Sequence, residues 1–65
     1  MKTNASTVLK SFHSNIDSNL VLIEIVENEN RYFSVRTLGM TEQLFETRED
    51  AERHAQLALK SFYAV

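Results

Sequence analysis

The chain has 65 residues, with seven basic and nine acidic side chains, no cysteine and one glycine. This length predicts a single domain over residues 1–65, with a small core and marginal stability. The composition excludes disulfides, thiolate zinc sites and a glycine-rich phosphate loop, and the formal charge of −2 disfavours binding to a polyanion.

The first predicted element is a helix over residues 5–16. Asn4 is placed to cap its first turn. The segment is rich in serine and threonine, which are poor helix formers, so packing must hold the helix together. The apolar side chains recur at i, i+1, i+4 and i+8, as on one stripe of a helix: Val8, Leu9, Phe12 and Ile16.

The aliphatic run Leu20–Val26 predicts a central β-strand, because it is largely β-branched and polar clusters bound it on both sides. Residues 17–19 form the turn before it. A three-residue loop over residues 28–30, with Asn30 in the left-handed conformation, predicts a hairpin with the next strand. Its register sets Ile25 opposite Phe33, Ile23 opposite Val35 and Glu27 opposite Arg31.

A short third strand is predicted over residues 42–46. Gly39 and Met40 form the turn before it, with Gly39 in the first central position of a type II′ turn. This turn sets Leu44 opposite Val35. The strand is short and polar, with a glutamate at each end, which suits the edge of a sheet.

The last element is the clearest helix. Thr47 is its predicted N-cap, with Asp50 three residues on as in a capping box, and Glu49 is placed to pair with Arg53. Three alanines let the helix approach the sheet closely, with Phe62 as the large anchor. The buried stripe is Ala51, Ala55, Ala58 and Phe62.

Together these elements predict an α+β fold, a three-stranded antiparallel meander with an N-terminal and a C-terminal helix (α-β-β-β-α). One face of the sheet is expected to receive the helices. It holds Val21, Ile23, Ile25, Phe33, Val35 and Leu44. The second face, which is also apolar, carries Leu20, Leu22, Val26, Tyr32, Leu38 and Phe45.

The second face allows two interpretations, because a solvated face would alternate apolar with polar residues and this one does not. Either the two helices cover opposite faces and the monomer is complete, or both share one face and the other is an interface. The second interpretation predicts a homodimer, or binding to another protein, with Glu24 and Arg36 paired across a two-fold axis. The candidate interface residues are Leu20, Leu22, Val26, Tyr32 and Phe45.

No set of residues predicts catalysis, a cofactor or a metal site. His13 and His54 are far apart in the chain and have no cysteine or carboxylate at ligand spacing. Asp50 and His54 stand at i, i+4, but no nucleophile is placed to use them. We therefore expect no enzymatic activity, no cofactor and no bound metal.

The predicted element order resembles the double-stranded RNA-binding domain, most clearly over residues 33–62. The strand Phe33-Ser34-Val35, the turn at Gly39 and the alanine-rich helix after Thr47 follow its outline. The resemblance implies the fold and not the function. Where that family opens its last helix with a lysine-rich motif, this chain has Arg48, Glu49, Ala51 and Glu52.

The sequence thus predicts a small interaction or regulatory module that self-associates through one sheet face. The first residues contain no apolar run that suits a signal peptide, so we expect a cytoplasmic protein without a membrane span. Two alternatives stay open. One is a small acidic inhibitor that occludes a host protein. The other is a divergent nucleic-acid binder that uses Lys2, Lys10, Arg48, Arg53 and Lys60.

Overall fold

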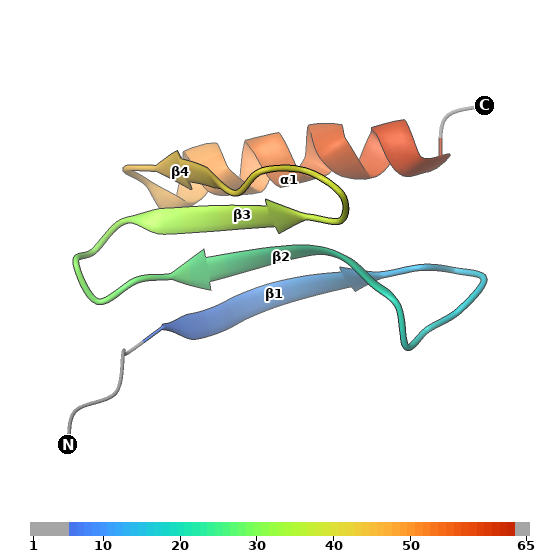
Figure 1. Ribbon diagram of the computed structural model, residues 1–65. Coiled ribbons are helices and arrows are strands. Elements are labelled where there is room, and N and C mark those ends of the chain that lie inside the picture. The colour runs from blue at the N-terminus through green and yellow to red at the C-terminus, as the bar shows by residue number, and fades with distance from the viewer. Residues whose placement is uncertain (1–5, 64–65) are drawn as a thin grey trace, which may run out of the picture.

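Four antiparallel strands form a sheet, and a helix packs against one of its faces (Figure 1). The computed structural model describes residues 6–63. Neighbours in the chain are neighbours in the sheet, in the order β1-β2-β3-β4. No helix in the described residues is both long and apolar enough to cross a membrane. The elements are β1 (Thr7–His13), β2 (Val21–Glu27), β3 (Phe33–Thr37), β4 (Gln43–Phe45) and α1 (Arg48–Tyr63).

The predicted N-terminal helix is wrong, because its residues form β1. The order is therefore β-β-β-β-α and not α-β-β-β-α. The pairing of β1 with β2 shifts between Val8 and Lys10, and again between Phe12 and His13. A bulge inserts a residue and interrupts the two-residue alternation of a strand. Leu9 and Phe12 both pack against the core, so their spacing of three imitates a helical period.

Two further residues had roles in the predicted N-terminal helix, Ile16 and Asn4. Ile16 is almost fully exposed in the loop after β1 and does not join the apolar stripe. Asn4, the predicted cap, lies outside the described residues.

The turn predicted at residues 17–19 is confirmed, because the Leu20 N–H donates to the Asp17 carbonyl at 2.9 Å. The Asn19 N–H also donates to Asp17 Oδ1 at 3.0 Å.

The β2–β3 hairpin forms, but its loop lies one residue further along the chain than predicted. The Asn28 N–H donates to the Tyr32 carbonyl at 2.9 Å, and the left-handed residue is Arg31, with φ of 67°, instead of Asn30. Ile25 therefore stands opposite Val35, and Ile23 opposite Thr37. The register has moved by two residues, so every side chain of this hairpin keeps its predicted face.

The β3–β4 turn also differs from the prediction, and this difference changes the face on which the residues of β4 lie. The Met40 N–H donates to the Thr37 carbonyl at 2.9 Å, which makes Gly39, with φ of +78°, the third residue of a turn. A type II turn requires glycine-like backbone at this position. The longer loop places Phe45 opposite Phe33 and Leu44 opposite Ser34. Leu44 and Phe45 have therefore exchanged the faces predicted for them.

The core lies between α1 and the face of the sheet that carries Ile23, Ile25 and Val35. Thr47 caps the helix as predicted, because its Oγ1 accepts from the Asp50 N–H at 3.1 Å. Ala51 and Ala55 are fully buried, which lets the helix axis approach the sheet. Phe62 is wrong as the anchor, since it is 37% exposed. Leu59, one turn earlier, packs against the core in its place.

Candidate interaction surfaces

The face of the sheet opposite α1, called the open face below, carries three cross-strand rows of side chains. No element of residues 6–63 packs on it (Figure 1). The first row is apolar apart from one serine and runs across all four strands: Val8, Val26, Ser34 and Leu44. The second is polar and holds Ser11, Glu24 and Arg36. Leu22 and Leu38 form the third, since the Leu38 N–H donates to the Leu22 carbonyl at 2.8 Å.

The five predicted interface residues are not all available on this face. Leu22 is 6% exposed and Val26 is 1% exposed, because they lie on a central strand that is flanked on both sides. Tyr32 is half-buried at the end of the face, and Leu20, just before β2, is partly exposed. Phe45 lies on the helix side, where its ring is 5.1 Å from that of His54.

Sequence reasoning missed the most exposed apolar residues of the open face. Leu44 is 61% exposed and Val8 is 49% exposed, whereas Leu38, which is 48% exposed, lies on the face predicted for it. Val8 was assigned to a helical stripe, and Leu44 to the core face by the wrong turn. The signal for Val8 was the β-branched pair Thr7-Val8, which favours a strand. Exposed apolar residues at both ends of an apolar row make this face able to bury further surface.

The polar row is an ion-pair network within one chain. Arg36 Nη1 lies 3.8 Å from Glu24 Oε1, and Arg36 Nε lies 3.5 Å from Glu42 Oε2. Glu24 and Arg36 are directly opposite each other on β2 and β3. The pair expected across a two-fold axis is therefore already made inside the chain, and each ion pair contributes little at such exposed positions.

No family model, curated protein or solved structure matches the chain.

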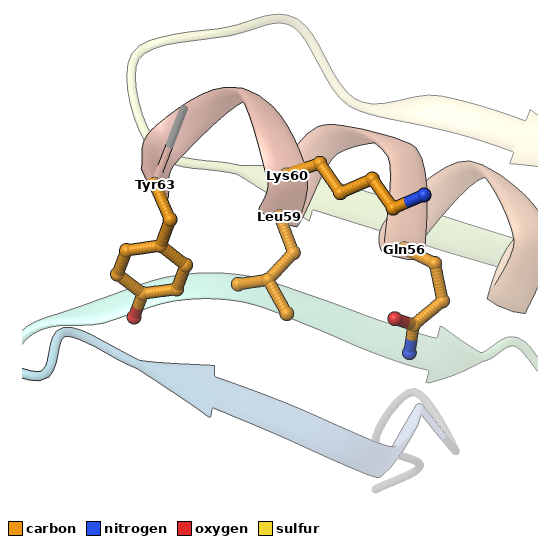
Figure 2. A pocket seen from close by; sticks show the side chains of 4 residues that line it. All are labelled: Gln56, Leu59, Lys60 and Tyr63. Carbon is orange, nitrogen blue, oxygen red and sulfur yellow. The ribbon is translucent and has the colours of Figure 1, made fainter. Parts of the chain in front are cut away.

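A second surface is a depression along α1, which lies on the other face of the sheet. Its helix wall is formed by Gln56, Leu59, Lys60 and Tyr63 (Figure 2). Tyr63 also donates its hydroxyl to the His13 carbonyl at 3.0 Å, which ties the end of the helix to the end of β1. We call this depression the α1–β1 groove.

The cations of the nucleic-acid alternative are divided between two environments. Arg48 pairs with Glu52 at 2.8 Å, and Arg53 pairs with Asp50 at 3.5 Å instead of with Glu49. Lys10 lies over the Phe12 ring at 5.4 Å, and Lys60 lines the α1–β1 groove. Lys2 lies outside the described residues. The two arginines face carboxylates, so they do not form a basic patch with the lysines.

The two histidines are not brought together. His54 packs against Phe45 with the two rings tilted by 40°, and it lines a shallow depression with Asp50, Arg53 and Leu57. His13 lies at the end of β1, where only its backbone carbonyl is engaged by Tyr63. Within residues 6–63, no three or more histidine, aspartate and glutamate side chains are grouped so that they could hold a metal ion.

Proposed function

We propose that the protein is a small interaction module that associates with a second copy of itself through the open face. The observation that carries this proposal is the apolar row from Val8 to Leu44, whose two end residues are half exposed or more. Apolar rows are self-complementary, as the isologous interface of a symmetric dimer requires. Burial of this row would remove exposed apolar area from water.

The small core gives a reason for such an association. The buried hydrophobic residues of the described chain number seven, and two of them are alanines: Leu22, Ile23, Ile25, Val26, Val35, Ala51 and Ala55. A domain of this size often supplements its core with disulfides, a metal or a partner subunit. Without cysteine, self-association is the supplement that the exposed surface favours.

The size of the face sets the strength of association that we expect. Strands spaced about 4.8 Å apart, with residues about 3.3 Å apart, give four strands of seven, seven, five and three residues a face of roughly 350 Å². Stable complexes bury about 800 Å² on each partner. We therefore expect a weak dimer, because interfaces that bury less than about 1,200 Å² in total belong mostly to weak and transient complexes.

Sedimentation equilibrium over a range of about 10 to 500 µM tests this proposal. We expect a monomer–dimer equilibrium that Leu44→Lys weakens at least about tenfold, because a lysine charge would have to be desolvated in the interface. Leu57→Lys is the matched control, since both leucines are 61% exposed and Leu57 lies on α1, away from the open face. Substitution of Leu22 or Phe45 is less informative because both contribute to packing.

A protein that stays monomeric over the whole range would contradict the proposal. So would an equal loss of association in Leu44→Lys and Leu57→Lys, since that result would place the contact outside the open face. Circular dichroism of each variant shows whether the fold is retained.

A further inference from the structure

The α1–β1 groove exists because the helix does not extend over the whole sheet. α1 packs on β2, β3 and β4 and does not run along β1. Leu9 and Phe12 of β1 therefore pack against the edge of the core while remaining partly accessible. Leu59 and Tyr63 line the helix side of the groove (Figure 2), and Leu59 packs against the same core as Leu9 and Phe12. At one end of the groove, the Tyr63 hydroxyl donates to the His13 carbonyl and so ties the helix to β1.

Two lysines border this groove, and Glu27, at the end of β2 opposite Thr7, is the acid of β2 on the same face of the sheet. Lys10 lies over Phe12, and Lys60 stands on the helix wall. Neither lysine has an ion-pair partner within residues 6–63. Residues 6–16 and 53–63 contain no aspartate or glutamate, whereas the whole chain has a formal charge of −2. The groove is therefore complementary to a ligand that has both apolar and acidic groups.

The same groove borders a strand edge that can accept a further strand. β1 is the outermost strand of the sheet and pairs only with β2 in the described chain. An extended segment added to such an edge gains main-chain hydrogen bonds, and its side chains enter the adjoining pockets. A second copy of β1 suits this edge poorly, because antiparallel pairing would bring the Lys10 side chains of the two copies together.

We propose that the α1–β1 groove binds an extended acidic segment of a partner protein, added as a strand beside β1. Its apolar side chains contact Phe12 and Leu59, and its carboxylates pair with Lys10 and Lys60. A protein segment fits better than a nucleic acid, since phosphate contacts dominate nucleic-acid affinity and two lysines supply few of them. This binding goes beyond the proposed self-association and uses the opposite face of the sheet.

Fluorescence anisotropy with three labelled peptides tests the proposal. Each peptide has about ten residues, enough to span a strand. They share the same valines and carry glutamate, glutamine or lysine at the remaining positions. We expect the glutamate peptide to bind at least about tenfold more tightly than the glutamine peptide, with a difference that shrinks as salt screens the lysines. The lysine peptide should bind most weakly.

The double variant Lys10→Gln/Lys60→Gln is expected to remove the preference for the glutamate peptide. Its matched control is Arg48→Gln/Arg53→Gln, which changes the net charge equally but alters residues outside the groove. Leu44→Lys should bind the glutamate peptide as the unsubstituted protein does, so a failure of self-association and a failure of peptide binding are distinguishable.

Two results would overturn the proposal. One is equal binding of the glutamate and glutamine peptides. The other is binding of single-stranded oligothymidylate as tightly as the glutamate peptide, which would assign the groove to polyanions in general.

Discussion

Asn28 holds the β2–β3 hairpin in its observed register through its side chain as well as its backbone. Its Nδ2 donates to Ser34 Oγ at 2.8 Å and to the Tyr32 carbonyl at 3.3 Å. Ser34 is buried in the apolar row of the open face. A buried hydroxyl needs a partner, so one amide side chain satisfies the serine and fixes where the hairpin closes.

We expect Asn28→Ala to lower the free energy of unfolding by about 1–3 kcal/mol, because the buried Ser34 hydroxyl then loses the donor that contacts it. Urea unfolding measures the change. The double variant Asn28→Ala/Ser34→Ala should recover part of the loss, since no polar group is then left without its partner. Asn15→Ala, in the exposed β1–β2 loop, is the control, with an expected change within about 0.5 kcal/mol. Equal losses at Asn15 and Asn28 would contradict this role.

The backbone conformations of two residues, Arg31 and Gly39, show which features of the turns were not predicted from the sequence. Asn commonly adopts positive φ, so Asn30 was the natural choice for the left-handed position, yet Arg31 takes it. Gly39 does have positive φ, but as the third residue of a turn that begins at Thr37. Each turn lies within one residue of its predicted place. Their closing residues depend on hydrogen bonds that the pattern of residue types does not encode.

Among the elements, β1 could not be predicted from the spacing of its apolar residues. The bulge at Leu9 gives Leu9 and Phe12 a helical spacing in an extended strand. By contrast, β2 has no bulge against β3 and was predicted to within one residue at each end. The strand alternation that assigned Ile23, Ile25 and Val35 to the core is likewise confirmed. Periodicity predicts elements with regular backbone and fails where an inserted residue breaks the repeat.

The helix was the most predictable element because its start and its buried face are local properties. Thr47, Ala51 and Ala55 occupy the places expected for them. We expect Thr47→Ala to lower the free energy of unfolding by about 1 kcal/mol, since the first turn loses its side-chain acceptor. Thr41→Ala, at an exposed position before β4, serves as the control. A loss at Thr47 no larger than that at Thr41, measured by urea unfolding, would show that the cap does not stabilise the helix.

The residues of the candidate interface were only partly predictable, because their exposure depends on which strands lie beside them. Which face a residue of β2 occupies follows from alternation, but whether it is exposed depends on its neighbours in the sheet. Once β1 adds a strand beside β2, Leu22 and Val26 become central and buried, and the exposed apolar residues are Val8 and Leu44 at the two edges. The errors in β1 and in the β3–β4 turn thus placed the predicted surface in the middle of the sheet, whereas the exposed apolar residues Val8 and Leu44 lie at its margins.

For the whole molecule, self-association links stability to protein concentration. A dimer that forms only between folded chains favours the folded state by mass action. Above the dissociation constant, we expect a tenfold rise in concentration to raise the midpoint of thermal unfolding by about 3–6 °C for a domain of this size. Leu44→Lys should remove this dependence and Leu57→Lys should keep it. A midpoint that is independent of concentration in the unsubstituted protein would contradict a stabilising dimer.

The strand order β1-β2-β3-β4 also bears on how the chain reaches its fold. Each strand pairs with the next one along the chain, so every hairpin closes a short loop and no crossover connection has to wait for distant segments to meet. The long-range event is the return of α1 over β2 and β3, which ends with Tyr63 beside His13, 50 positions apart. We therefore expect the sheet to assemble one hairpin at a time, with docking of the helix as the step that limits the folding rate.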